Sequence, residues 1–310
     1  MALAVVISNS RPICAAPLPP IDTTVPQSLG IKGWWKNGSS EDWEKLYAAG
    51  ARYVNRTGGP WYWDQVETSK GSYSFDGCDG LLKSAEAKGM TVVACLYGGN
   101  KLYEDPKPGG IRSPAARKGF AGFAAALAGR YKNRRIIFEI WNEPNITGFW
   151  GNHGKANSID FADEYTALVK ETVTAMRKAD PKCFIMVGST SCLWNESFEW
   201  IERCLQQGIL DGKPNAWSVH PYGFTYPEKC IDKGYEPLRK LFAKHGAPKD
   251  FVIMDSEVGY TLGAWMEKGG SPKDRNIQLD HQAWYCIRQY MVDLLCDVKL
   301  SVWYQWKTED

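Results

Sequence analysis

The feature that most constrains the fold is a regular alternation of short β-like runs with longer amphipathic stretches along most of the chain. Eight runs are rich in apolar, β-branched and aromatic residues, as buried strands are. Successive runs start about 38 residues apart on average, a spacing typical of βα units. The predicted strands begin at Ile31, Arg52, Thr91, Ile136, Phe184, Ala216, Phe251 and Leu300.

The stretches between these runs have helical periodicity, and they cover residues 42–49, 76–88, 115–130, 161–180, 196–207, 235–245 and 280–297. Eight βα units in 310 residues predict an α/β fold of the (β/α)₈ TIM-barrel type. A doubly wound open sheet is the alternative, but no glycine-rich dinucleotide-binding turn follows the first predicted strand.

The two ends of the chain carry separate expectations. Residues 1–24 include "MALAVVISNSRPICAAPLPP", which resembles the tail end of a signal peptide although it lacks a basic start. We therefore expect a signal-peptide remnant and linker at 1–24, a catalytic barrel at 25–310, and a secreted or periplasmic location. The chain stops at Asp310 directly after the eighth strand. We expect a barrel without its eighth helix, truncated relative to the natural protein and less stable than an extended version.

Composition excludes several classes of function. A net charge of +2 and the lack of lysine- or arginine-rich runs argue against nucleic acid or an anionic membrane as a partner. No stretch approaches the roughly 20 apolar residues of a membrane helix. Nine cysteines without a CxxC pair, and four scattered histidines, give no metal-ligand pattern, so we expect no metal and no other cofactor. We also expect a monomer.

The cysteines suggest two roles. Cys95 and Cys183 lie in strand-like runs and are expected in the core. Cys192, Cys204 and Cys230 lie near predicted loops and are candidates for a disulfide in an oxidising compartment.

Two glutamates at strand ends are the main clue to function. Strand four runs into "IWNEPN", which places Glu143 at its carboxyl end, and strand seven ends with Glu257. In a (β/α)₈ barrel the chemistry lies at these carboxyl ends. One carboxylic acid can protonate a glycosidic oxygen while a carboxylate about 5–5.5 Å away attacks the anomeric carbon, whereas a wider gap admits water and inverts that centre. Either glutamate alone is as easily an ordinary strand-end charge, but the pair amid aromatic residues favours catalysis.

The motifs around these glutamates resemble those of glycoside hydrolase clan A. They are "IWNEPN" followed by "FW", then "SVHPYG" and "MDSEVGY", and "SKGSYSFDGCDGLLKSAEAKGMTVV" is similar to the segment that leads into strand three. The nearest pattern is that of family 39, which includes β-xylosidases, with family 5 cellulase-like enzymes as near alternatives. The resemblance implies a retaining (β/α)₈ barrel.

The same resemblance implies roles for individual residues. Glu143 is expected to be the general acid/base and Glu257 the nucleophile. Asn142 is expected to bind the sugar 2-hydroxyl, Tyr222 to hold the nucleophile, and His220 to line the pocket. The nucleophile needs hydrogen-bond donors that keep it ionised.

Four aromatic residues complete the predicted substrate site. Clan members place a tryptophan beneath the sugar at strand eight. Trp306 is the first candidate here and Trp303 is the alternative if the register differs. Tyr97 ends strand three, and Trp34 follows strand one. Flat rings of this kind stack on the apolar faces of sugars.

The second strand departs from the clan pattern. Clan members carry an arginine near the end of this strand that supports the nucleophile. The corresponding position holds Asn55, with Arg56 beside it. Either the register slips by one residue or the support comes from elsewhere, and the two differ because neighbours on a strand face opposite ways.

These observations favour a retaining glycoside hydrolase that cleaves β-glycosidic bonds in oligo- or polysaccharides. A catalytically silent carbohydrate-binding barrel is the alternative from another class, although sugar binding alone requires no pair of carboxylates. A transglycosylase would share every residue named here and differ only in its acceptor. A metal-dependent hydrolase is less favoured because the histidines form no cluster.

Overall fold

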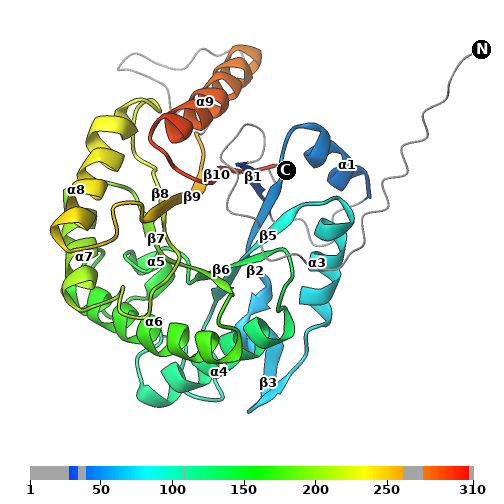
Figure 1. Ribbon diagram of the computed structural model, residues 1–310, viewed down its shortest axis with the longest axis vertical. Helices are drawn as coiled ribbons and strands as arrows, with labels where there is room; N and C mark the ends of the chain where they lie inside the picture. The colour runs from blue at the N-terminus through cyan, green and yellow to red at the C-terminus, as the bar shows by residue number, and fades with distance from the viewer. Residues whose placement is uncertain (1–27, 34–39, 108, 261–274, 307–310) are drawn as a thin grey trace, which may run out of the picture.

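The computed structural model describes residues 28–33, 40–107, 109–260 and 275–306, except the side chains of 40, 56–58 and 275–278. Eight parallel strands close into a barrel in the order β1-β10-β9-β8-β7-β6-β5-β2, which confirms the predicted fold class. Figure 1 shows helices arranged around this ring of strands. The strands are β1 (Leu29–Lys32), β2 (Tyr53–Tyr62), β5 (Thr91–Tyr97), β6 (Ile136–Ile140), β7 (Phe184–Ser191), β8 (Ala216–His220), β9 (Val252–Val258) and β10 (Ser301–Tyr304).

The helices on the outside of the barrel begin close to the predicted positions. Serine side chains define two of the starts, because Ser113 accepts a hydrogen bond from the Ala116 amide and Ser158 accepts one from the Phe161 amide. The long helices are α1 (Ser40–Ala48), α3 (Asp76–Ala87), α4 (Pro114–Arg130), α6 (Ile159–Ala179), α7 (Asn195–Gln206), α8 (Glu236–Lys244) and α9 (Arg275–Leu295), and the short ones are α2 (Trp63–Val66), α5 (Thr147–Trp150) and the π-helix η1 (Ile231–Tyr235).

Apolar side chains fill the barrel and the layer between strands and helices. Strands β5, β6 and β8 are buried along almost their whole length, as expected of parallel strands covered on both faces. Alternate residues point inward. The barrel interior contains Val93, Ile137, Met186, Ala216, Met254, Leu300 and Val302. Because side chains alternate along a regular strand, this layer indicates which residues of the strand ends face the barrel mouth. Strand β9 departs from this alternation, because its pairing with β10 shifts register between Ser301 and Trp303.

One insertion between β2 and α3 was not predicted. It contains α2 and a small hairpin of β3 (Glu67–Ser69) and β4 (Ser72–Tyr73). The buried Glu67 carboxylate accepts hydrogen bonds from Trp63 Nε1, Tyr103 Oη and the Gly71 amide, each at 2.6 Å. Three donors compensate a charge that would otherwise be costly to bury.

The two predictions about the cysteines have different outcomes. Cys95 and Cys183 are buried, as expected. Cys192, Cys204 and Cys230 are free, so these three do not form the suggested disulfide in this structure. None of the helices in the described ranges is long and apolar enough to cross a membrane.

Helix α9 presents an apolar face to solvent. Trp284, Ile287, Met291 and Leu295 are exposed by 56%, 59%, 64% and 75%, and their spacing places them on one side of the helix. In Figure 1 no described helix lies between α9 and α1. The predicted signal-peptide remnant at 1–24 lies outside the described residues, and the last described residue is Trp306, two residues after β10.

Candidate active site

Glu143 is presented by an unusual turn at the end of β6. After Ile140 the backbone takes left-handed conformations, with φ of 71° at Trp141 and 46° at Glu143. Such conformations cost about 1–3 kcal/mol each for residues other than glycine, and they persist where the surrounding structure enforces them. The Glu143 amide donates to Ser189 Oγ at 3.4 Å, and the residue is only 6% exposed. The turn directs this carboxyl group across the barrel mouth.

Glu257, near the end of β9, lies in an environment that favours its charge. Burial alone would raise the pKa of this carboxyl group, but an ion pair with Lys32, the nearby His220 ring and a hydrogen bond from Tyr222 outweigh it and hold the pKa below its ordinary value. Tyr222 Oη donates to Glu257 Oε1 at 2.8 Å, which is the contact predicted from the sequence. These surroundings therefore favour the carboxylate form of Glu257.

The two glutamates meet at His220. His220 Nδ1 lies 3.0 Å from Glu143 Oε1 and 3.9 Å from Glu257 Oε2. Atoms of these three side chains all lie within 4.8 Å of one another. One oxygen of the Glu143 carboxyl group therefore lies within 4.8 Å of an oxygen of the Glu257 carboxyl group.

Lys32 supplies the cation that the sequence left unassigned. Its ammonium group, almost fully buried at the end of β1, pairs with Glu257 and donates to Asn142 Oδ1 at 3.2 Å. Burial alone would lower the pKa of Lys32, but the carboxylate of Glu257 raises it above its ordinary value. Asn55, also buried, donates from Nδ2 to the backbone oxygen of Ser256 at 2.9 Å, while the Arg56 side chain lies outside the described residues. Among the described side chains, the cation paired with Glu257 is thus Lys32 of β1.

The predicted aromatic residues do not all lie at the mouth. Tyr97 does: its ring packs on Trp141 at 4.7 Å between centroids, and its hydroxyl donates to the Phe149 carbonyl at 3.3 Å. Trp306 instead donates from Nε1 to Asp42 of α1 at 3.3 Å, and Trp34 lies outside the described residues.

Trp303 lies on the outer side of its strand, which corrects its predicted place in the sugar pocket. Its ring stacks on Tyr260, whose ring in turn packs against Tyr285 of α9. Val302 is inside the barrel, so alternation places Tyr304 on the inward side. Tyr304 is half-buried and lies in register with Lys32. The aromatic residue of β10 that faces the mouth is therefore Tyr304, which the sequence reasoning did not choose.

A pair of buried aspartates lies behind the nucleophile, on the outer side of β9. Asp255 Oδ1 accepts from the Glu257 amide at 3.1 Å. Asp293 of α9 accepts hydrogen bonds from Tyr235, Gln289 and Ser301. Burial, reinforced by the charge of Asp293, raises the pKa of Asp255 well above its ordinary value, and burial also raises that of Asp293. The buried location and the proximity of two like charges therefore disfavour ionisation of both carboxyl groups at once.

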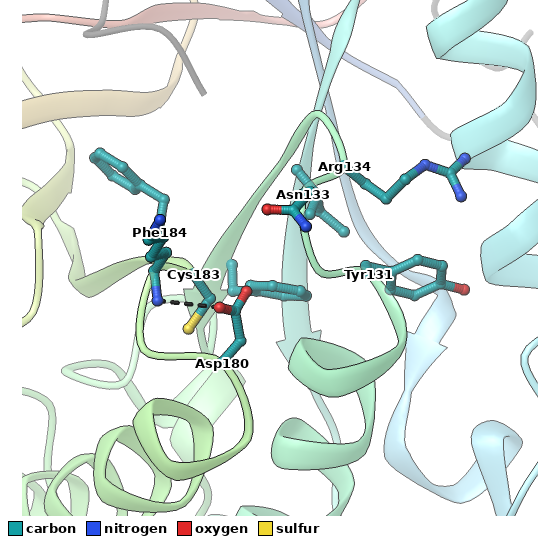
Figure 2. Close-up of a pocket in the computed structure, with 9 residues that line it drawn as sticks. Tyr131, Asn133, Arg134, Asp180, Cys183 and Phe184 are labelled. Atoms are coloured by element: carbon teal, nitrogen blue, oxygen red, sulfur yellow. Dashed lines mark hydrogen bonds between the residues drawn. The ribbon is translucent and has the colours of Figure 1, made fainter. Parts of the chain in front are cut away.

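The opposite end of the barrel has a small hollow of about 120 Å³, shown in Figure 2. It lies at the amino-terminal ends of β6 and β7, and none of the predicted site residues lines it. Arg134, one of the two cationic residues in its lining, is paired with Glu86 at 2.9 Å. Labelled residues of its lining are Tyr131, Asn133, Arg134, Asp180, Cys183 and Phe184. This end of a (β/α)₈ barrel serves stability rather than chemistry.

The mouth offers three metal-ligating side chains, Glu143, His220 and Glu257. The Lys32 ammonium group is paired with one of them and would repel a cation placed between them. The donor set therefore suits an organic substrate better than a metal ion.

The family model of the cellulases, glycosyl hydrolase family 5, matches residues 27–252, which is well over half of the chain. The chain belongs to this family. The sequence motifs pointed first to family 39, with family 5 as a near alternative, and both families lie within the predicted clan. No curated protein sequence matches this family 5 chain.

Solved structures share the fold at low sequence identity. A family 39 glycoside hydrolase from Bacteroides cellulosilyticus WH2 is 18% identical, with a TM-score of 0.72 over 91% of this chain and 56% of its own. A family 39 β-xylosidase from Caulobacter crescentus is 16% identical, with a TM-score of 0.63 over 94% of this chain and 64% of its own. XacCel5A in complex with cellopentaose is 15% identical, with a TM-score of 0.60 over 91% of each chain. The family 5 chain thus spans under two thirds of the length of these two family 39 structures.

Proposed function

We propose that the protein is a retaining glycoside hydrolase that cleaves β-linked oligo- or polysaccharides by double displacement. The observation that carries this proposal is the close approach of two carboxyl groups in different environments. Glu143, Glu257 and His220 have atoms within 4.8 Å of one another, and Glu257 alone is paired with a cation and a tyrosine hydroxyl. Groups so arranged divide into an acid and a nucleophile.

In the first step Glu257 attacks the anomeric carbon while Glu143 protonates the departing oxygen, which leaves a glycosyl–enzyme ester. In the second step Glu143 takes a proton from water, which attacks the same carbon and releases Glu257. Lys32 holds Asn142 by its Oδ1, which fixes the amide beside the nucleophile, where it binds the sugar 2-hydroxyl. Tyr304 and Tyr97 supply ring faces for the sugar.

The substrate class is inferred from the family and the similar structures. A cellulase family model, a β-xylosidase and a cellopentaose complex favour β-linked glucans or xylosides as the first substrates to test. We also propose that the protein acts outside the cytoplasm, because polymeric glycans do not cross membranes. Cell fractionation of the source organism tests this location.

Single substitutions separate the two catalytic roles. Glu257→Ala should abolish turnover of all aryl β-glycosides, and azide should restore activity by forming the α-azide. Glu143→Ala should lose about 10²–10⁴-fold on poor leaving groups but spare good ones, which need no protonation, and azide should give the β-azide. NMR should show that the product is released with the same anomeric configuration as the substrate.

The same assays separate the alternatives. Equal losses by both variants on every leaving group would contradict the role assignment. Binding of glycans without any turnover would favour the silent carbohydrate-binding barrel. Transfer to a sugar acceptor in preference to water would favour a transglycosylase.

A further inference from the structure

A second buried glutamate is linked by hydrogen bonds to the acid. Glu139 lies near the end of β6, is fully buried, and shares the inward face of the strand with Ile137. Ser256 Oγ donates to Glu139 Oε1 at 2.6 Å, and within the described residues Glu139 Oε2 has no hydrogen-bond partner. His220 Nε2 lies 3.1 Å from the same Ser256 oxygen. A continuous chain therefore runs from Glu139 through Ser256 and His220 to Glu143.

The direction of this chain follows from the number of protons. A serine hydroxyl has a single proton, and Ser256 gives it to Glu139. The Ser256 oxygen therefore presents a lone pair to His220 Nε2, and that contact is favourable only if Nε2 carries a proton. Ser189 Oγ, 3.3 Å from Nε2, can accept from the same N–H.

The other ring nitrogen is then constrained. With its proton on Nε2, a neutral His220 has a lone pair on Nδ1, which lies 3.0 Å from Glu143 Oε1. A carboxylate at this distance would face that lone pair, so a proton belongs between them. We propose that Glu139, acting through Ser256, fixes the proton of His220 on Nε2, so that His220 Nδ1 and Glu143 share one further proton at the reaction centre.

Other charged and titratable groups around Glu139 are compatible with this arrangement. Lys32 of β1 interacts electrostatically with Glu139. Cys95 lies beside Glu139 in the β5–β6 register, and Tyr165 of α6 interacts electrostatically with Glu139. Glu257 interacts with Lys32 and with His220.

This inference rests on the proposed function and deepens it. Loss of the shared proton would leave a carboxylate against a lone pair, so the chain of hydrogen bonds opposes that loss. If Ser256 could instead donate to Nε2, the ring would move its own proton to Nδ1 and stabilise a Glu143 carboxylate. Glu139 is therefore a positioning residue that acts through Ser256 and His220.

Two variants and two measurements test the proposal. Glu139→Gln frees the Ser256 proton, and Ser256→Ala removes the linking lone pair. Imidazole nitrogen NMR of ¹⁵N-histidine protein reads the protonation of His220 directly, with signals assigned by replacing each of the other three of the four histidines. We expect Nε2 to be protonated in the unaltered protein and both variants to shift protonation toward Nδ1.

The pH profile is the second readout. For a glycoside with a poor leaving group, both variants should move the high-pH fall of activity down by about one pH unit. Thr172→Val is the matched control, because Thr172 is also fully buried and its hydroxyl has no partner within the described residues. It should leave the His220 signals and the profile unchanged.

The outcomes are distinct. An unprotonated Nε2 in the unaltered protein, or variants that fold with unchanged His220 signals and an unchanged profile, would overturn the proposal. Relocation of the ring proton in a protein that hydrolyses no glycoside would leave the proton arrangement standing and refute the proposed function instead.

Discussion

Replacing Lys32 by methionine should move the low-pH limit of activity toward neutral pH. Lys32 is 2% exposed, and its ammonium group is paired with Glu257. Methionine fills a similar volume without charge. The Glu257 carboxylate would then keep the hydrogen bond from Tyr222 but lose its nearest cation, while the cost of its burial remains.

The expected size follows from this geometry. An opposite charge in contact lowers the pKa of a carboxyl group by about 1–3 units, so the acidic limb of kcat/KM should rise by that amount. Well below that limb, activity should fall by about 10- to 1000-fold. An activated aryl glycoside is the substrate for this assay, because it needs no proton from Glu143 and reports the nucleophile alone.

Lys32→Met should also lower the free energy of unfolding, and the size of this loss should depend on pH. The pKa of Glu257 is lowered in the folded protein, so the ion pair stabilises the fold above the unfolded-state pKa, and this contribution is lost as pH falls through the folded value. Breaking a buried pair costs about 3–5 kcal/mol. Denaturant unfolding should show this loss near pH 7 and a smaller one near pH 3.

Lys45→Met is the matched control, since Lys45 forms an exposed i,i+4 pair with Glu41 on α1 and should affect neither property. A folded Lys32→Met protein whose acidic limb coincides with that of the unaltered protein would refute the role given to Lys32.

Three further predictions concern the surroundings of the nucleophile. Tyr222→Phe removes one donor and should raise the acidic limb by a smaller amount than Lys32→Met, as measured by the same profile. Tyr304→Ala should lower kcat/KM about tenfold or more with little loss of stability. Trp303→Ala should instead cost about 3–5 kcal/mol of stability, because Trp303 is only 8% exposed. Thermal melts and kinetics distinguish the two variants, and the reverse pattern would contradict the orientation of β10. Because the pKa of Asp255 is raised in the folded protein, this residue stabilises the fold below its unfolded-state pKa, and the contribution is lost as pH rises through its folded-state pKa. Asp255→Asn should remove this pH dependence of the unfolding free energy, by up to about 1.4 kcal/mol per pH unit. Unfolding free energies at pH 4 and 7 that match those of the unaltered protein would refute this prediction.

The order of elements was predictable because it depends on local patterns. Each buried parallel strand is a short apolar run, and each outer helix has its own periodicity. The strand-end position of Glu143 could be read from the run that precedes it, and that of Glu257 likewise. The hairpin β3–β4 was missed because its strands contain three and two residues, too few for a pattern.

Residues that depend on closure of the barrel could not be assigned from the sequence. Lys32 lies beside Glu257 because β1 pairs with β10, which in turn pairs with β9, and 225 residues separate the two partners along the chain. A lysine in the otherwise apolar run "IKGWW" was the available signal. Whether Trp303 or Tyr304 faces the mouth likewise depends on which face of a four-residue strand points inward, and so short a strand fits either orientation.

The turn at Trp141 and Glu143 limits how this barrel can evolve and be engineered. Both residues hold left-handed backbone conformations that glycine or asparagine would adopt at lower cost. Selection for thermal resistance alone would therefore favour replacing Glu143, the proposed acid, so that the gain in stability and the loss of catalysis would come from the same substitution. A lineage released from hydrolysis could drift into a more robust sugar-binding barrel by this route. Mutant libraries designed for higher thermal stability should leave residues 141–143 unchanged and vary the solvent-facing side of α9 instead.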